Sequence, residues 1–362
     1  MATQVQHIAV PPAVDVKRYM ATPITQQKPL DFSQYDLPGG KEKLTAQMKA
    51  AVEDTGFFYV TNCGLTEEDI DRQFELGKKI LDLPEEEKLK YRAPIEKGDY
   101  NGYRPLGAIE QFPGLRDNWE CYHIFKFIPE LQRAHPQLVR DQYAEIERFH
   151  RHIHQDVAAK VLRLLARVLE IPEDTLEANH RYDDDTCSSF LRYVKYHARP
   201  RAVNAKYDNI YVRGHTDFGS VTFLFSQPVG GLQLQLPGDG GWADVAHVPG
   251  SIIVNTADML HFWSNGYLQS CVHRVVAPPP DQEHLDRYGL IYFLRPRDAM
   301  CLESVDSPLL KRKGISTEGE SQELRERRKV PVGQWVPIQT KKNWTPFGEQ
   351  PQDGKGFQSL FR

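Results

Sequence analysis

The chain of 362 residues corresponds, at about 150 residues per domain, to one large or two modest domains. Its 45 lysines and arginines against 49 aspartates and glutamates give a net charge of −4, which does not point to a nucleic-acid partner. No apolar run approaches the roughly 20 residues of a membrane span, and no basic segment followed by an apolar core opens the sequence. We therefore expect a globular protein with neither nucleic-acid nor membrane partners.

The cysteines indicate the redox compartment. Five are scattered along the chain and none forms a Cys-x-x-Cys pair, so neither a disulfide framework nor a thiolate zinc site is indicated. This usage is typical of a reducing compartment, and we expect a cytoplasmic protein. The five are Cys63, Cys121, Cys187, Cys271 and Cys301.

The first half of the chain is predicted to be mainly helical. Apolar residues recur every three or four positions in several segments, and a β-prone run follows the first of them. From residue 98 to 129 the sequence is rich in aromatic residues, glycine and proline, which indicates surface loops or short strands of the kind that border a site. In chain order we expect an extended arm over 1–27, a helix over 41–55, a buried strand over 57–60, a helix over 66–83, a short helix leading into a loop over 83–93, and a long core helix over 138–170.

The period of the pattern changes to two beyond about residue 186. Short β-prone runs there are separated by proline, glycine, asparagine and aspartate, which is typical of an antiparallel barrel or jelly roll. Helices followed by strands indicate an α+β organisation. Near the end of the chain we expect a helix over 318–329 and then an irregular tail.

Three His-x-Asp pairs are candidates for a metal site, because residues i and i+2 of a strand point to the same face. His154 and Asp156 lie in the predicted core helix, where two positions turn the side chains about 200° apart. His284 and Asp286 lie in a polar stretch that predicts a solvated loop. Both pairs are therefore predicted not to bind metal.

The third pair, His215 and Asp217, begins a β-prone run with glycines on either side, which lets the backbone approach a bound group. A third ligand is required, and His273 lies on a later β-prone segment that a barrel can return to the same mouth. His261 is a rival, although its apolar neighbours favour a core histidine. Two histidines and one carboxylate form the facial triad of non-haem Fe(II) oxygen chemistry, and zinc also accepts these ligands.

Arg287 begins an alternating strand downstream of His273. An arginine at the head of a buried strand needs an anion to offset its burial, and its planar guanidinium suits a carboxylate. A bidentate anionic cosubstrate would meet that need. A structural ion pair at the end of the barrel is the alternative.

At this point an ordered set of motifs resembles the Fe(II)- and 2-oxoglutarate-dependent dioxygenases of the isopenicillin N synthase-like group. The motifs are "GFFYVTNCG", "LPEEEKLKY", "NGYRPLG", "GHTDFGSVTFLF", "VGGLQL", "SNGYLQSCVHRVV" and "RYGLIYFLRP". The resemblance implies a distorted double-stranded β-helix, or jelly-roll core, with an N-terminal helical region packed against it. It divides the chain into an arm (1–27), an N-terminal dioxygenase region (28–135), a helical spine (136–185), a catalytic jelly roll (186–300) and a C-terminal extension (301–362).

The resemblance also implies roles for single residues. His215, Asp217 and His273 would bind Fe(II), Arg287 would bind the distal carboxylate of 2-oxoglutarate, and Tyr196 would reach the same carboxylate through its hydroxyl. The family pattern after the arginine is Arg-x-Ser, and this chain has Gly289 in place of the serine. One hydroxyl donor to the carboxylate is therefore missing, which is worth about 1 to 3 kcal/mol for a charged acceptor.

The implied activity is oxidation of a C–H bond of a small organic substrate with 2-oxoglutarate and O₂, in specialised metabolism. Hydroxylation, desaturation and ring rearrangement all remain open. A cupin-like zinc hydrolase and a non-catalytic binding protein are the rival interpretations, although a non-catalytic relative would normally have lost a ligand or the arginine. We expect substrate contacts from Tyr103, Arg104, Trp119, Tyr122, Phe218 and Phe293, each with core packing or solvation as its alternative.

Overall fold

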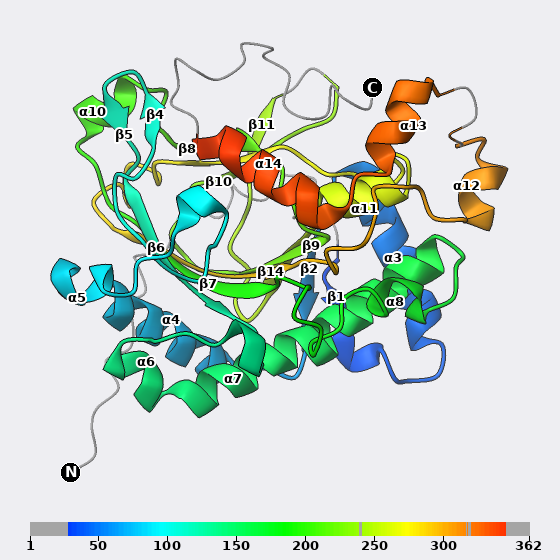
Figure 1. Cartoon of the computed structure of the whole chain (residues 1–362), viewed down its shortest axis with the longest axis horizontal. Coiled ribbons are helices and arrows are strands. Elements are labelled where there is room, and N and C mark those ends of the chain that lie inside the picture. The colour runs from blue at the N-terminus through cyan, green and yellow to red at the C-terminus, as the bar shows by residue number, and fades with distance from the viewer. Residues whose placement is uncertain (1–27, 239–240, 316, 318–319, 345–362) are drawn as a thin grey trace.

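The computed structural model describes residues 28–238, 241–315, 317 and 320–344, and the predicted arm over 1–27 lies outside them. Two β-sheets face each other, and helices cover the outer side of the larger one (Figure 1). The larger sheet has eight strands in the order β1-β2-β12-β9-β14-β7-β6-β3. These strands are β1 (Leu30–Asp31), β2 (Phe57–Thr61), β3 (Gly102–Arg104), β6 (Trp119–Phe125), β7 (Phe190–Tyr196), β9 (Val221–Phe225), β12 (Ile252–Thr256) and β14 (Arg287–Leu294).

The smaller sheet has four antiparallel strands in the order β11-β10-β13-β8. They are β8 (Ile210–His215), β10 (Leu232–Gln235), β11 (Trp242–Asp244) and β13 (His273–Val276). A separate hairpin joins β4 (Glu110–Phe112) to β5 (Leu115–Arg116). Buried side chains from both sheets pack together in two clusters, and one of them joins Val194 and Tyr196 of β7 to Tyr211 and Val275 of the smaller sheet. The two sheets therefore close on each other as the two halves of a jelly roll.

Alternation along β7 and β14 assigns each side chain to one side of the large sheet. Leu191 and Tyr193 belong to the main core with the helices, whereas Val194 and Tyr196 belong to the cluster between the sheets. The same alternation places Leu290 and Tyr292 on the helical side. The space between the sheets is called the barrel interior below, and the opposite face of the large sheet the helical side.

The helical side is covered by the predicted amphipathic helices. The core helix predicted over 138–170 is nearly continuous, and a π-helical segment in its middle joins two α-helices. The helices before the jelly roll are α3 (Gly40–Asp54), α4 (Glu67–Leu81), α5 (Glu85–Leu89), α6 (Gln137–Asp141), α7 (Tyr143–His152), η4 (Ile153–Ala158), α8 (Ala159–Val168) and α9 (Asp174–Glu177), with the 3₁₀ turns η1 (Phe32–Gln34), η2 (Ile95–Lys97) and η3 (Pro129–Leu131).

Helix starts follow the sequence closely. The side chain of Thr66 accepts a hydrogen bond from the backbone N–H of Asp69, and the Asp69 carboxylate accepts one from the backbone N–H of Thr66. This reciprocal capping satisfies two amide groups that would otherwise lack partners at the start of α4. The predicted helices over 41–55 and 66–83 and the strand over 57–60 are thus present with small shifts at their ends, and the short helix predicted within 83–93 covers Glu85–Leu89.

The C-terminal part differs from the prediction of one helix and an irregular tail. Helix α13 (Gln322–Arg328) falls within the predicted range, but a further helix, α14 (Val332–Trp344), follows it and runs diagonally across the upper half of the view in Figure 1. Pro337 lies inside α14, and a proline there predicts a break rather than a helix. The other helices of this half are α10 (Arg201–Ala205), α11 (Asp258–Trp263) and α12 (Pro308–Arg312).

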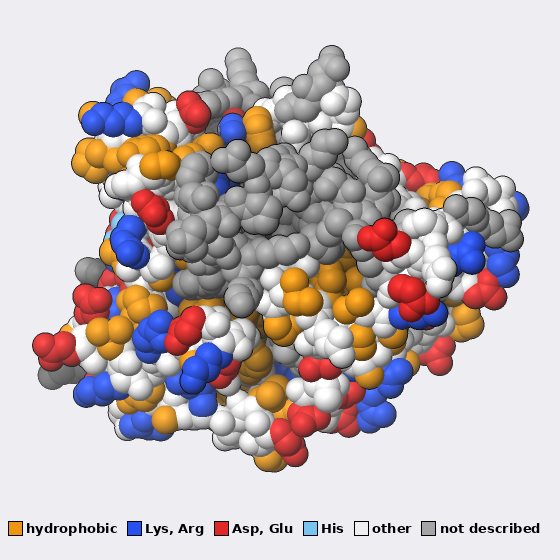
Figure 2. Space-filling model, turned by 45° about the horizontal axis from the view of Figure 1, so that its top comes forward, with side chains coloured by type: hydrophobic (Ala, Val, Ile, Leu, Met, Phe, Trp, Pro, Cys, Tyr) orange, Lys and Arg blue, Asp and Glu red, His pale blue; other side chains and the backbone are white. Residues whose placement is uncertain are grey.

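The surface seen in Figure 2 carries lysine and arginine side chains interspersed with aspartate and glutamate over its described part. Within the described residues, none of the helices combines the length and the apolar character that crossing a membrane requires.

Candidate metal centre

The predicted triad converges at one end of the smaller sheet. His215 ends β8, His273 begins β13, and the two residues are direct partners in the antiparallel register. Asp217 follows β8 by two positions and faces both imidazoles. Its Oδ1 lies 4.0 Å from His215 Nε2 and its Oδ2 lies 3.8 Å from His273 Nε2. Among the described residues, this is the one group of histidine, cysteine or acidic side chains whose ligand atoms all lie within 4.8 Å of one another.

Hydrogen bonds orient both imidazoles toward the centre. His215 Nδ1 lies 2.9 Å from the carbonyl oxygen of Arg213, and His273 Nδ1 lies 3.2 Å from that of Cys271. Because a carbonyl oxygen can only accept, each Nδ1 carries the proton and each Nε2 keeps a free lone pair facing the other ligands. This is the support that metal-binding histidines use.

Asp217 is fixed by two neighbouring strands. Thr222 Oγ1 and Asn255 Nδ2 donate to its Oδ2 over 2.7 and 3.0 Å. Burial alone would raise the pKa of Asp217, but the adjacent His273 and His215 and these two hydrogen bonds outweigh it and lower the pKa. The carboxylate is therefore ionised, as a metal ligand must be.

Burial, together with the nearby charges of His273 and Arg192, lowers the pKa of His215 to about 4. The imidazole is therefore neutral at pH 7 and can donate its lone pair. One carboxylate and two imidazoles on one side of a centre suit a divalent transition metal with open positions.

Arg287 lies deeper in the barrel interior, where its strand β14 pairs with β7 and places it opposite Tyr196. The residue is 5% exposed, and its guanidinium carbon lies 5.6 Å from the centre of the Tyr196 ring. No carboxylate of a described residue forms an ion pair with it, and its buried Nε has no hydrogen-bond partner there. Burial lowers the pKa of Arg287. A buried guanidinium without a protein anion fits a ligand carboxylate, so the residues present suit 2-oxoglutarate.

The space beside Arg287 explains the glycine that replaces the family serine. Gly289 is the register partner of Val194, and a Cβ added to Gly289 would lie 2.8 Å from Val194 Cγ1. A valine methyl group on the neighbouring strand therefore occupies the place that a serine side chain would need. The two positions are coupled, and Gly289 is required by the packing of this barrel.

Two of the residues predicted to contact substrate lie on the helical side. Tyr103 is 1% exposed and donates to Glu120 Oε2 over 2.6 Å, and the hydroxyl of Tyr122 lies 2.9 Å from His135 Nδ1. Both rings belong to the main hydrophobic core. Tyr103 and Tyr122 therefore lie in surroundings of core packing, which was the alternative to substrate contact.

Arg104 and Trp119 lie together at the edge of the barrel. The guanidinium carbon of Arg104 is 3.4 Å from the centre of the Trp119 ring, and its two terminal nitrogens donate to both oxygens of Asp117 over 3.1 and 2.6 Å. The charge of Arg104 is thus neutralised by a protein carboxylate. Trp119 also packs against Tyr196, with ring centres 6.3 Å apart.

Phe218 and Phe293 lie nearer the triad. Phe218 follows Asp217 directly and meets the ring of Trp335 on α14 edge-on, with ring centres 5.7 Å apart. This contact places α14 over the mouth of the barrel beside the triad. Phe293 packs in the barrel interior against Phe190, with ring centres 5.0 Å apart.

The histidines predicted not to bind metal lie elsewhere. His154 lies in η4 on the helical side and His261 lies on α11, where its Nδ1 is 3.0 Å from the carbonyl oxygen of Leu268. Asp286 accepts a hydrogen bond from the backbone of Ala198 over 2.9 Å and pairs with Lys195 at 3.3 Å. None of these residues joins the triad.

Two arginines of the barrel interior were missed from the sequence. Arg192 shares the inward face of β7 with Tyr196, and Arg295 continues the inward face of β14 two residues beyond Phe293. The available signal was their even spacing from Tyr196 and Arg287 along the same strands. The aromatic rings around them are those of Tyr100, Phe190 and Phe293.

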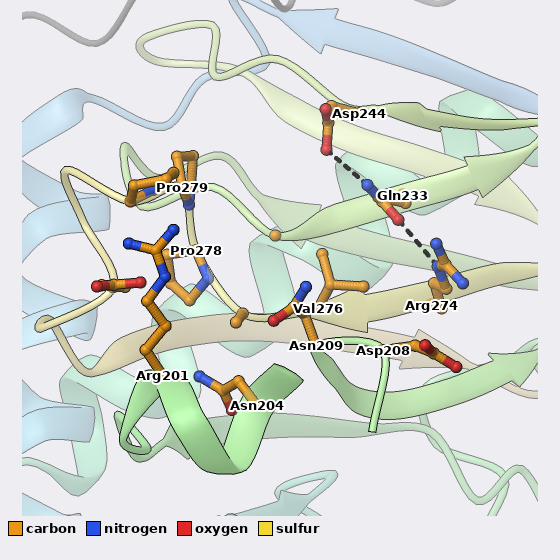
Figure 3. A pocket seen from close by; sticks show the side chains of 14 residues that line it. Arg201, Asn204, Asp208, Asn209, Gln233, Asp244, Arg274, Val276, Pro278 and Pro279 are labelled. Carbon is orange, nitrogen blue, oxygen red and sulfur yellow. Dashed lines mark hydrogen bonds between the residues drawn. The ribbon is translucent and has the colours of Figure 1, made fainter. Parts of the chain in front are cut away.

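A cavity of about 330 Å³ lies on the outer face of the smaller sheet (Figure 3). Its lining residues Gln233, Arg274 and Val276 alternate with Leu234, His273 and Val275, which face the barrel interior. Arg274 donates to Gln233 over 2.9 Å, and Gln233 donates to Asp244 over 3.0 Å. This cavity is therefore separated from the triad by the sheet itself.

Two protein-family models match the chain. The one described as 2OG-Fe(II) oxygenase superfamily matches residues 186–296, which include the triad and Arg287. The one described as non-haem dioxygenase in morphine synthesis N-terminal matches residues 29–145.

Similar proteins cover most of the chain. A UPF0676 protein of Schizosaccharomyces pombe is 32% identical over 295 residues, which are 79% of this chain and 84% of the relative. The 2-oxoglutarate-dependent dioxygenase htyE of Aspergillus rugulosus is 27% identical over 75% of this chain and 88% of its own length. The crystal structure of Neurospora crassa T7H in complex with alpha-KG superimposes with a TM-score of 0.71 at 24% identity, covering 86% of this chain and 94% of that one. The predicted double-stranded β-helix is confirmed by this likeness.

Proposed function

The chain belongs to the 2OG-Fe(II) oxygenase superfamily, and from this premise we propose that His215, Asp217 and His273 hold Fe(II) while Arg287 and Tyr196 bind 2-oxoglutarate. The activity is that of a 2-oxoglutarate-dependent dioxygenase, with Fe(II), 2-oxoglutarate and O₂ as its cofactors and cosubstrates. The observation that supports the residue assignment best is the convergence of two oriented imidazoles and one ionised carboxylate within 4.8 Å.

The protein groups prepare this site for an anionic chelating cosubstrate. Bound Fe(II) would supply the open coordination positions and the electrons for O₂ activation. Thr222 and Asn255 hold Asp217 so that its carboxylate stays ionised and aimed between the imidazoles. Arg287 offers a carboxylate a rigid positive anchor in a dry environment, where an ionic hydrogen bond is strong.

Arg287 and the triad lie at different depths of the same barrel interior. A cosubstrate with a carboxylate at one end and a metal-binding 2-oxo acid at the other would bridge them. Phe218 and Trp335 cover the mouth beside Asp217 and reduce access of water to the reacting atoms. The substrate we propose is a small organic molecule that presents a C–H bond to the metal, with Phe293 among its contacts.

The test is an anaerobic titration of the Fe(II)-loaded protein with 2-oxoglutarate, followed through the weak visible charge-transfer absorption of the chelate. We expect a band that saturates in the wild type and is lost in Asp217→Ala. In Arg287→Ala the affinity for 2-oxoglutarate should fall about 100-fold, because truncating one partner of a buried charge pair costs about 2 to 5 kcal/mol.

Arg274→Ala is the matched control, since Arg274 follows His273 directly but lies on the outer face of the same strand. It should leave the titration unchanged. A protein that binds iron and gives no band with 2-oxoglutarate would contradict the proposal. Activity that required zinc and ignored 2-oxoglutarate would favour a hydrolase.

A further inference from the structure

Two guanidiniums in the barrel interior have no anion supplied by the described residues. Arg192 projects from β7 and is partly exposed, and Arg295 follows β14 and is 8% exposed. No carboxylate of a described residue lies within the 4.0 Å of an ion pair from either one, whereas Arg104 at the barrel edge is paired with Asp117. A charge that is buried without a partner is costly, so the burial of Arg295 without a protein anion points to a ligand that supplies one.

The contacts of Arg192 orient its guanidinium. His123 Nδ1 lies 2.6 Å from the carbonyl oxygen of Tyr100, so this nitrogen carries the proton and Nε2 accepts. Arg192 Nε donates to that Nε2 over 2.8 Å. The Nε position is therefore occupied, and the two terminal nitrogens form the fork that remains for a ligand. The guanidinium carbon also lies 4.4 Å from the centre of the Phe293 ring.

Arg295 approaches the same aromatic cluster. Its guanidinium carbon lies 5.1 Å from the centre of the Phe190 ring and 5.5 Å from that of Tyr100. Its one side-chain hydrogen bond to a described residue is a long one of 3.5 Å to Ser188 Oγ. The guanidinium carbon of Arg192 lies 5.7 Å from the centre of the same Phe190 ring, so both guanidiniums approach this ring.

The two arginines approach the triad through neighbouring residues. Phe293, whose ring centre lies 4.4 Å from the guanidinium carbon of Arg192, is the register partner of Thr222, which donates to Asp217. A Cβ added to Gly219, two residues beyond Asp217, would lie 3.6 Å from Arg295 Cγ. A molecule held by both guanidiniums would therefore lie beside the metal centre.

Charge balance gives the sign of that molecule. In the proposed holoenzyme, Arg192, Arg287, Arg295 and a divalent ion face Asp217 and the dianion of 2-oxoglutarate, so two positive charges remain. If Asp298 is counted as well, one remains. Positive charge remains in both counts, so an anionic substrate is favoured in a site where unpaired charge is costly, and one carboxylate balances the count that includes Asp298.

We propose that the substrate is a small organic carboxylate, that its carboxylate is bound by the terminal nitrogens of Arg192 and by Arg295, and that its apolar body packs on Phe190 and Phe293. This proposal rests on the proposed function and names the substrate class of that site. The planar arginine fork matches a carboxylate with two parallel hydrogen bonds, which a neutral amide cannot reproduce. Arg192 and Arg295 are thus specificity-determining residues.

The experiment compares benzoate with benzamide, which have the same shape and differ in charge. Each is titrated anaerobically into enzyme saturated with Fe(II) and 2-oxoglutarate, and its dissociation constant is measured by calorimetry and by perturbation of the chelate absorption. We expect benzoate to bind at least tenfold more tightly than benzamide. Arg192→Gln and Arg295→Gln should each weaken benzoate at least tenfold and leave benzamide unchanged.

Lys195→Gln is the matched control, because Lys195 is a cation of the same strand that pairs with Asp82 and Asp286 on the opposite face. It should leave both dissociation constants unchanged. Arg192→Lys and Arg295→Lys retain the charge without the planar fork, and should keep a preference for benzoate at reduced affinity. These variants keep the test usable if a glutamine variant does not fold.

The outcomes separate the two proposals. If the chelate band forms and benzoate binds no better than benzamide, or binds equally well in both arginine variants, the carboxylate proposal is overturned and the proposed function stands. If the band does not form in the wild type, the proposed function fails and the carboxylate proposal fails with it. Affinity for 2-oxoglutarate should stay within about threefold of wild type in the Arg192 and Arg295 variants, because Arg287 binds that molecule.

Discussion

Arginine side chains at the edge of the barrel, around β3, and in the barrel interior differ in whether a protein carboxylate pairs with them. At the edge, Arg104 meets both oxygens of Asp117, which also accepts the backbone N–H groups of Gly107 and Ile109 over 3.1 and 2.7 Å. In the interior, Arg287 and its two neighbours on β7 and β14 meet aromatic rings and no carboxylate among the described residues. Arginine is thus part of a closed network at the edge, meaning one whose charged members pair with one another, whereas in the interior it has no anionic partner among the described residues.

The comparison shows how a structural charge differs from a binding charge. A network whose members satisfy one another fixes the fold, and removing one member leaves an uncompensated charge behind. A guanidinium that the protein leaves without an anion lowers the stability of the ligand-free state, and the ligand offsets that cost when it binds. Exposure alone would not separate them, since Arg104 is 1% and Arg287 5% exposed.

The largest effect on stability is expected from opening the closed network. Asp117→Asn removes the anion from Arg104 and should lower the free energy of unfolding by about 3 to 5 kcal/mol, because the guanidinium remains buried without a partner. Urea denaturation of the ligand-free protein measures this change. Asp183→Asn is the control, since the Asp183–Arg181 pair is exposed and such pairs contribute about 0 to 1 kcal/mol.

For the matched substitution in the barrel interior we expect no loss of stability. Arg287→Gln removes a cation that has no protein anion, so the ligand-free protein should lose no stability while its affinity for 2-oxoglutarate falls. A loss of stability as large as that of Asp117→Asn would contradict the distinction between the two regions.

A smaller loss of stability is expected from Gly289→Ser, because Val194 occupies the space beside Arg287 that the serine would need. Gly289→Ser should cost about 1 to 3 kcal/mol in urea denaturation, because the new Cβ would lie 2.8 Å from Val194 Cγ1 and overpack the barrel. The double variant Val194→Ala with Gly289→Ser should regain most of this stability. Its serine hydroxyl should then tighten 2-oxoglutarate roughly tenfold in the chelate titration. If Gly289→Ser alone were as stable as the wild type, the coupling between the two positions would be wrong.

The sequence was sufficient for the fold and for the metal-binding candidates because both depend on local pattern. Alternation predicted the jelly roll, and the His-x-Asp pair in a β-prone run predicted the convergence of His215 and Asp217, although β8 ends at His215 and Asp217 lies two residues beyond it. His273 was placed by the barrel topology. The position of Tyr196 opposite Arg287 followed from the resemblance and is matched by the register of β7 and β14.

The sequence was insufficient where strand register or tertiary packing decides. Arg192 faces the interior only because of the phase of β7, and a short run of mixed polar and apolar residues does not fix that phase. Val194 and Gly289 become partners only across two strands. Helix α14 was missed because Pro337 lies within it, and its packing through Trp335 is a tertiary contact.

The smallest expected effect on stability comes from two buried histidines on the helical side, His154 and His180, whose ring nitrogens are all hydrogen-bonded. Tyr292 donates to His154 Nδ1 and Ser220 donates to His180 Nε2, over 2.6 and 2.7 Å, while the other ring nitrogens donate to carbonyl oxygens. Burial lowers the pKa of His154 to about 3 and that of His180 to about 4. Both imidazoles are therefore neutral components of a satisfied network.

The sign of the pH dependence follows from these pKa values. Below pH 6.5 the unfolded chain takes up protons on these histidines and the folded protein does not, so stability falls as the pH falls toward about 4. Between pH 7 and 5.5 each imidazole should cost about 1 kcal/mol, which urea denaturation across that range measures. His180→Gln should reduce the pH dependence by that amount, and His284→Gln, which removes an exposed histidine, is the control. If the pH dependence of stability were unchanged in His180→Gln, the folded protein would be able to protonate His180, and the prediction that this imidazole stays neutral would be wrong.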